Sequence, residues 1–214
     1  MILTVGATKG GVGKTTVALN LAIGRALAGR DVWLIDGDRQ GTLQTAVSIR
    51  AEEGRAPALA CSQFVDGPTL RAQVLQQGRK FQDVIIDAGG RDSTALRAAL
   101  TLCDVLVIPF QPRSFDLWAM QDVLSLAKEA QSVRDNLRVC ALLNQADAQG
   151  ADNADATQVI QSLAGLELLE STLGRRKAYA SAAGSGLSVL ESSPKDAKAC
   201  AEVKRLIDLI FIVK

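Results

Sequence analysis

A glycine-rich segment at residues 8–16, Thr-Lys-Gly-Gly-Val-Gly-Lys-Thr-Thr, constrains the fold more than any other part of the chain. It follows a strand-like run at 2–7 and leads into a helical pattern at 14–28. In such a unit, glycines let consecutive backbone N–H groups turn toward phosphate oxygens, and the helix N-terminus adds partial positive charge. The segment therefore predicts a phosphate-binding loop. The alternative is a glycine-rich turn that only caps a helix. The Gly-Lys-Thr tripeptide, in register with the flanking strand and helix, favours the phosphate-binding loop.

The chemistry of such a loop assigns roles to its side chains. The ammonium group of Lys14 is expected to reach the outer phosphates, and the hydroxyl of Thr15 suits a magnesium ion. The strict form of the motif has glycine where this chain has Thr8. The residues expected to bind a nucleotide here are Lys9, Gly10, Gly11, Val12, Gly13, Lys14, Thr15 and Thr16.

Strand-like runs alternate with helical patterns along the chain, which is typical of a parallel sheet with crossover helices. Continuously apolar cores indicate strands that are covered on both faces. Helices are expected at 14–28 and 115–131, and a short one after a surface loop at 145–156, with two more near the C-terminal end. The predicted fold is α/β: a single doubly wound P-loop domain over residues 1–214, with a mostly parallel sheet flanked by helices on both faces. The predicted strands are 2–7, 32–36, 83–87, 105–109 and 137–144, a weaker one at 58–64 and a possible edge strand at 166–169.

Composition narrows the chemistry. The chain has no histidine, which argues against the usual zinc sites and Ser-His-Asp catalysis. The four cysteines are scattered and form no Cys-x-x-Cys pair, as expected for reduced thiols in the cytoplasm. No run of eighteen apolar residues and no signal-peptide pattern is present, so we expect a cytoplasmic protein.

Acidic side chains close two of the predicted strands. Asp87 ends the run Asp-Val-Ile-Ile-Asp at 83–87, a Walker B pattern whose carboxylate binds magnesium through water. Gly90 completes an Asp-x-x-Gly sequence, in which a backbone N–H senses the outer phosphate. Asp36 and Asp38 follow the strand at 32–36. They either face the nucleotide or cap the next helix.

The loop form Lys-Gly-Gly-x-Gly-Lys-Thr-Thr at 9–16 resembles the deviant Walker A loop of the ParA/MinD family, and small plasmid-type ParA proteins in particular. Residues 36–41, Asp-Gly-Asp-Arg-Gln-Gly, resemble the family motif Asp-x-Asp-Pro-Gln-Gly, with Arg39 in place of proline. Residues 109–118 resemble the segment that follows the fifth strand in small ParA proteins. The resemblance thus extends over most of the chain.

This resemblance implies a weak, partner-stimulated ATPase that uses ATP and Mg²⁺. Its catalytic residues would be Lys9, Lys14 and Asp38. Lys9 would cross the interface of an ATP-driven dimer to the partner's nucleotide, and Asp38 would orient the attacking water. The residues that hold the magnesium ion would be Thr15, Asp36 and Asp87.

Three interpretations of the segment at 144–147 stay open. Asn144 ends a predicted strand at a position where the family often places a polar side chain on adenine. The sequence Asn-Gln-Ala-Asp at 144–147 also resembles the Asn-Lys-x-Asp guanine motif of related GTPases. The two-lysine phosphate loop favours ATP, and a simple polar strand end is a third possibility.

Charge is uneven along the chain. Residues 175–214 carry eight Lys or Arg against four Asp or Glu, an excess of +4, whereas residues 1–174 carry a net −3. Such an excess is either a solvated surface or a DNA-binding face, and the resemblance favours DNA. We expect ATP hydrolysis to survive loss of the first two arginines, because they lie far along the chain from the phosphate loop. The expected DNA-binding residues are Arg175, Arg176, Lys177, Lys198, Lys204 and Arg205.

The resemblance implies a DNA partition ATPase, cytoplasmic and nucleoid-associated. Its partners would be a second copy in an ATP-bound homodimer, non-specific DNA and a centromere-binding, ParB-like protein. The alternative is a MinD-like positioning ATPase on the membrane, suggested by the apolar tail 203–214, although apolar residues all round better fit a packed helix. An iron–sulfur electron carrier is disfavoured by the positions of Cys103 and Cys140. Trp118 falls on the polar side of its helix, which indicates a contact surface or a half-buried ring.

Overall fold

The computed structural model describes residues 1–214 except 91–92, 113–116, 150 and 212–214. Its strands form one seven-stranded sheet in the order β3-β2-β4-β1-β5-β6-β7, and every pair of neighbours runs parallel. The sheet expected to be mostly parallel is thus parallel throughout its described pairs. The strands are β1 (Ile2–Val5), β2 (Val32–Asp36), β3 (Ala60–Gln63), β4 (Asp83–Asp87), β5 (Val105–Phe110), β6 (Arg138–Ala146) and β7 (Glu167–Gly174).

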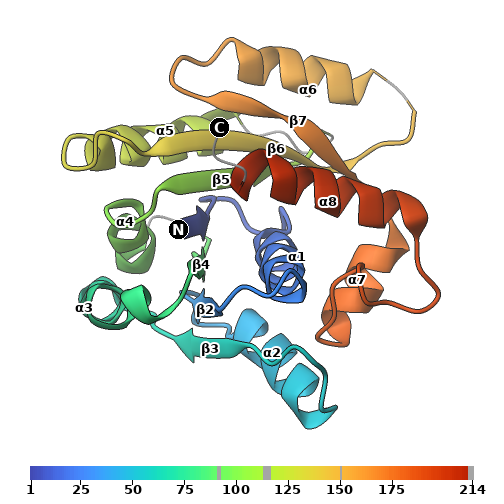
Figure 1. Ribbon diagram of the computed structural model, residues 1–214. Helices are drawn as coiled ribbons and strands as arrows, with labels where there is room; N and C mark the ends of the chain where they lie inside the picture. The colour runs from blue at the N-terminus through green and yellow to red at the C-terminus, as the bar shows by residue number, and fades with distance from the viewer. Residues whose placement is uncertain (91–92, 113–116, 150, 212–214) are drawn as a thin grey trace.

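Helices cover both faces of this sheet (Figure 1). One apolar cluster joins the sheet to α1, α2, α7 and α8, and α1 packs directly on α8. Two further clusters join the other face to α3, α4, α5 and α6. The helices are α1 (Lys14–Leu27), α2 (Thr42–Glu52), α3 (Gly67–Gln77), α4 (Thr94–Leu100), α5 (Leu117–Gln131), α6 (Asp152–Gln161), α7 (Lys177–Gly184) and α8 (Ala197–Phe211), with a 3₁₀ turn at Gly78–Lys80.

Local sequence explains where these helices begin and end. The side chains of Asp66 and Ser93 cap α3 and α4 by accepting hydrogen bonds from backbone N–H groups three residues on. Gly29 adopts φ +78° just after α1, the left-handed conformation expected of a residue that ends a helix.

The sequence prediction was wrong over part of the stretch 145–156. β6 continues through Ala146, and α6 already begins at Asp152. Asp152 and Asp155 lie in the first turn of α6, where negative charge stabilises the exposed N–H groups of a helix, so this aspartate-rich sequence suits a helix start. The possible edge strand is confirmed as β7, which extends to Gly174. Of the predicted helix at 115–131, residues 115 and 116 lie outside the described residues.

Strand register brings the predicted acidic residues together. Val5, at the end of β1, is in register with Asp87, and Asp87 is in register with Asp36 on the other side. In parallel sheets, ligands bind beyond the carboxyl ends of the strands. The three strand ends therefore form the floor of one edge, and the glycine-rich segment 8–13 rises from it into α1.

Candidate nucleotide site

The glycine-rich segment forms a loop whose shape only glycine permits at two points. Gly11 and Gly13 have φ of +75° and +89°, and a Cβ on Gly13 would lie 2.3 Å from the side-chain nitrogen of Asn144. The side chain of Lys14 is buried, and its Nζ donates a 3.2 Å hydrogen bond to the carbonyl oxygen of Lys9. Burial lowers the pKa of Lys14, and the charges of Asp87 and Asp38 oppose that shift.

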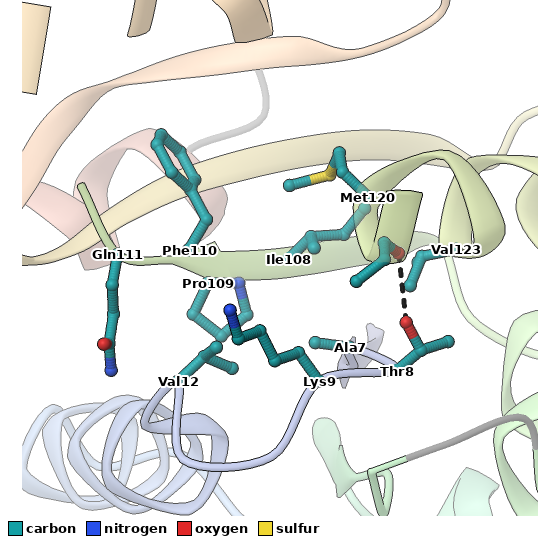
Figure 2. Close-up of a pocket in the computed structure, with 11 residues that line it drawn as sticks. Ala7, Thr8, Lys9, Val12, Ile108, Pro109, Phe110, Gln111, Met120 and Val123 are labelled. Atoms are coloured by element: carbon teal, nitrogen blue, oxygen red, sulfur yellow. Dashed lines mark hydrogen bonds between the residues drawn. The ribbon is translucent and has the colours of Figure 1, made fainter. Parts of the chain in front are cut away.

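Two side chains anchor the loop from outside. The hydroxyl of Thr8 donates a 3.0 Å hydrogen bond to the carbonyl oxygen of Ala119 in α5, as the dashed line in Figure 2 shows. The side-chain nitrogen of Gln111 donates a 2.7 Å bond to the carbonyl oxygen of Gly11. The departure from the strict motif at Thr8 thus ties the loop to the first turn of a neighbouring helix. No pattern in the sequence pointed to Gln111 as a residue that anchors the loop.

The side chain of Lys9 points away from the floor of the site. It lines a small pocket with Pro109 and Phe110 at the end of β5, and Figure 2 shows it extending toward that strand. Lys14, by contrast, lines an open cleft of about 1100 Å³ together with Thr15 and Gly90. We call this the phosphate cleft. The two lysines of the loop therefore occupy different surroundings.

Asp87 is buried at the floor of the cleft. Its Oδ2 accepts a 2.6 Å hydrogen bond from the hydroxyl of Thr15, and its Oδ1 is buried without a partner among the described residues. Burial raises the pKa of Asp87 to about 7, although the bond from Thr15 opposes this. A buried carboxylate oxygen left without a donor, beside a hydroxyl, fits a magnesium ion or its water. Gly90 lies beside Lys14, because a Cβ on Gly90 would be 3.4 Å from Nζ.

The two aspartates that follow β2 differ in their contacts. Both oxygens of Asp36 accept backbone N–H groups at 3.0 Å, one from Asp38 and one from Gln44 in the first turn of α2. Asp36 is buried, which raises its pKa against these two bonds. The helix-capping interpretation therefore describes Asp36. Asp38 is partly exposed and lines the phosphate cleft, as the nucleotide interpretation requires.

A second cleft, of about 320 Å³, adjoins the phosphate loop. Gly13, Thr16, Asn144 and Gln145 line it together with residues 174–177, 179 and 180. The amide of Asn144 is buried and donates a 2.7 Å hydrogen bond to the carbonyl oxygen of Val12. Gln145 adopts φ +53°, which is uncommon for a residue other than glycine. This cleft is the candidate site for the base and ribose.

The guanine interpretation loses support here. It needs the carboxylate of Asp147 in the base cleft, but Asp147 does not line that cleft. Its Oδ1 lies 3.8 Å from Nε of Arg175. The base role of Asn144 stays a prediction.

The six basic residues expected to bind DNA separate into two groups. Arg175, Arg176 and Lys177 line the second cleft together with Gly13 and Thr16. These residues lie far along the chain from the phosphate loop, but β7 returns the chain to the edge where β1 ends. Distance along the chain is therefore no reason to expect that ATP hydrolysis survives loss of the two arginines. Lys198, Lys204 and Arg205 lie on the exposed face of α8.

Carboxylates hold the arginines among these residues. Arg176 pairs with Glu202 at 2.6 Å, and Glu202 also accepts bonds from the N–H of Gly174 and the hydroxyl of Tyr179. Arg205 lies 3.5 Å from Glu170. Lys177, Lys198 and Lys204 form no ion pair within the described part of the chain.

Two other surface predictions have clear outcomes. The side chain of Trp118 is 80% exposed, so the half-buried alternative was wrong. In the tail, Leu206 and Ile210 are buried, and the guanidinium of Arg25 lies 4.3 Å from the ring centroid of Phe211. The apolar tail thus packs on the core as far as Phe211. Residues 212–214 lie outside the described residues. None of the described helices combines the length and the apolar composition that a membrane span requires.

A parallel sheet with a glycine-rich loop between β1 and α1, and with Thr15 joined to a strand-end aspartate, defines a P-loop nucleotide-binding protein. The family model of the CobQ/CobB/MinD/ParA nucleotide binding domain matches residues 3–189. The chain belongs to this family, and its class is that of the ParA/MinD-type ATPases.

Relatives match nearly the whole chain. It is 28% identical over 210 residues to maintenance of carboxysome distribution protein A of Halothiobacillus neapolitanus, covering 98% of this chain and 95% of the relative. It is 32% identical over 192 residues to the protein of the same name from Gloeobacter kilaueensis, covering 89% and 84%. The solved ATP complex of a McdA variant from Cyanothece superposes with a TM-score of 0.77 over 97% of this chain and 94% of that one, at 16% identity. That likeness shows the shared fold.

Proposed function

We propose that this chain is an ATP-driven positioning ATPase, whose ATP-bound dimer holds non-specific DNA and whose hydrolysis is stimulated by a partner on the cargo. Mg²⁺-ATP is its nucleotide. Lys14 and the backbone of residues 10–16 hold the phosphates. Thr15 and Asp87 serve the magnesium ion directly and through water, which is supported by the unpartnered buried Oδ1 of Asp87. Asp36 fixes the loop that carries Asp38.

Lys9 acts on the partner's nucleotide. Its side chain lies outside the phosphate cleft, against the end of β5, and this supports a role across an interface rather than within one chain. A second ammonium on the triphosphate stabilises charge that develops during phosphoryl transfer.

Asp38 orients the attacking water from the rim of the same cleft. Replacement of Asp38 by alanine should therefore give a long-lived ATP-bound dimer, because water activation is lost while both lysines remain. Normal turnover of this variant in the presence of the partner would remove Asp38 from the mechanism.

Non-specific DNA binds the basic face around α8. Support comes from Lys198 and Lys204, which are exposed and have no ion pair with any described residue. A net excess of +4 in one subunit is small, and dimerisation doubles the number of phosphate contacts. DNA binding therefore follows the ATP-bound dimer and declines steeply with salt.

The cargo is a protein compartment of the carboxysome kind, handled through a partner in the role of ParB. The observation that carries this proposal is the match along 98% of the chain to a protein named for carboxysome distribution. Replicon partition is the second candidate, because the phosphate-loop and Asp36–Gly41 motifs resemble those of plasmid ParA proteins.

The first experiment is sedimentation with DNA and with anionic liposomes, each with ATP, ADP or no nucleotide. We expect pelleting with DNA in ATP alone. A double variant, Lys198→Ala with Lys204→Ala, should weaken binding equally for all sequences. It should lower the log–log salt slope by about 3.6, because each of the two subunits loses two phosphate contacts. The matched control is Lys128→Ala, on α5 at the opposite face of the sheet. ATP-dependent pelleting with liposomes but not DNA would replace this proposal with the membrane alternative.

The cargo is tested in the source cell. Deletion of the gene should cluster compartments while plasmids are retained. Loss of plasmids with evenly spaced compartments would favour the second candidate.

A further inference from the structure

The guanidinium group of Arg39 lies at the rim of the phosphate cleft, and no carboxylate of the described residues pairs with it. Arg39 is exposed and lines the same cleft as Lys14, Thr15 and Gly90. Its side chain forms no hydrogen bond or ion pair with any residue that the structure describes. Several other arginines are held by carboxylates, as Arg50 is by Glu191 and Arg138 by Glu167.

The turn that presents Arg39 is fixed from three directions. The carbonyl oxygen of Asp38 accepts bonds from the N–H of Gly41 at 3.2 Å and from the side chain of Gln63 at 2.8 Å. The carboxylate of Asp38 accepts a 3.0 Å bond from the N–H of Gln40. Gly41 completes the turn with φ +64°. The backbone conformation of the turn therefore does not depend on the side chain of Arg39.

Proline is the residue that this place in a turn favours, because Arg39 is the second residue of a turn closed by the bond from Gly41 to Asp38. Arginine gives up the fixed φ of proline there. The bonds from Gln40 and Gln63 hold the turn without it. What arginine adds at this position is a guanidinium group at the mouth of the cleft.

The charges in the cleft favour an anionic ligand for that group. A guanidinium presents a planar fork of donors that matches phosphate oxygens, and such charge-assisted bonds are among the strongest in proteins. The carboxylates of Asp36 and Asp38 are nearby in sequence, yet they accept backbone N–H groups instead of pairing with Arg39. Lys14 is the lysine that reaches the cleft floor, and it has Asp87 close by.

We propose that Arg39 binds the outer phosphate of ATP held in its own subunit's cleft, and so makes the site distinguish ATP from ADP. This inference rests on the proposed placement of the triphosphate against Lys14 and Thr15, and it is independent of DNA and cargo. In hydrolysis, the same contact stabilises negative charge on the transferred phosphate. Arg39 is then a cation in addition to the two lysines of the loop.

The test compares affinities for a non-hydrolysable ATP analogue and for ADP by calorimetry with Mg²⁺. Arg39→Ala should weaken binding of the analogue by roughly 10- to 100-fold, as expected for a charged hydrogen bond, and leave ADP binding within about twofold. Arg39→Lys should recover part of the difference. Arg39→Pro should behave like Arg39→Ala, because it restores the turn but not the charge. Arg79→Ala, exposed on the 3₁₀ turn, is the matched control.

An unchanged ratio of the two affinities in Arg39→Ala would overturn the proposal. If the ratio were unchanged because both affinities fell equally, the role of Arg39 would be structural, within the turn. The measurement is repeated in the Lys9→Ala background, where ATP-driven dimerisation is expected to be weak. Disappearance of the Arg39 effect there would overturn a contact within one subunit. Failure of the proposed nucleotide site itself would look different, because Lys14→Ala would then leave both affinities unchanged.

Discussion

The side-chain nitrogen of Asn144 donates a 2.7 Å hydrogen bond to the carbonyl oxygen of Val12 and so joins β6 to the phosphate loop. A Cβ at position 13 would lie only 2.3 Å from the same nitrogen, so glycine is required there. Asn144 thus shapes the loop directly, whatever it does for the base.

Replacing Asn144 by alanine should weaken ATP and ADP binding alike by about tenfold, because one hydrogen bond to a buried carbonyl is lost. Calorimetry with each nucleotide measures this, with the exposed Asn136→Ala as control. Unchanged affinities would show that the loop keeps its shape without β6.

Lys14→Ala should weaken ATP binding by at least about 100-fold, since the loop's cation at the cleft floor is removed. Fluorescence competition against a labelled nucleotide is suitable, with Lys80→Ala as control. An affinity within a few-fold of the wild type would contradict the assignment of the phosphate loop.

Lys9→Ala should leave ATP binding by one subunit within about threefold but weaken the ATP-dependent dimer, because its side chain lies outside the cleft. Light scattering after size exclusion gives the mass with ATP and with ADP. A dimer that forms normally in this variant would refute a role across the interface.

Asp87→Asn tests the buried carboxylate through pH. The folded-state pKa of about 7 exceeds the reference value of 3.8, so the carboxyl's stabilising contribution is present at low pH and is lost as pH rises through 7. Without nucleotide, the wild type should lose on the order of 2 kcal/mol more stability than Asp87→Asn from about pH 5 to about pH 8. Urea unfolding at several pH values measures the difference. Parallel profiles would argue against a raised pKa.

Arg50→Ala should destabilise the fold by about 3–5 kcal/mol, because it leaves Glu191 partly buried and unpaired. Arg50 is 1% exposed and holds both oxygens of Glu191 at 2.8 Å. The matched control is Arg55→Ala, whose exposed pair with Glu53 should contribute less than about 1 kcal/mol. Equal midpoints in thermal unfolding would contradict this contrast.

Patterns that repeat locally could be predicted from the sequence. The strands at 32–36 and 83–87 have the predicted bounds, because apolar runs covered on both faces are unambiguous. The same holds for the start of α1 at Lys14, which the glycine-rich loop determines. The family resemblance supplied the expected roles of Lys9 and Asp38.

Contacts between distant segments could not be read from the sequence. The bonds from Gln111 to Gly11 and from Asn144 to Val12 depend on how β5 and β6 pass the loop. The pairing of Arg176 with Glu202 likewise depends on how α8 packs, and charge counting along the chain cannot show that this arginine is already engaged. From the sequence, Arg39 could be recognised only as a departure from the family motif. The role that we propose for it depends on the cleft that it lines.

The position of β1 at the centre of the sheet also decides how the molecule can be made. Ile2 is in register with Val84, and Leu3 is in register with Val105, so both neighbours of β1 come much later in the chain. A nascent chain that ends before residue 105 carries the whole phosphate-loop sequence without β5, one of the two strands between which β1 lies. Such long-range pairing is slow and leaves apolar segments exposed meanwhile. Fragments that keep the motif but end before β5 should therefore aggregate rather than bind nucleotide.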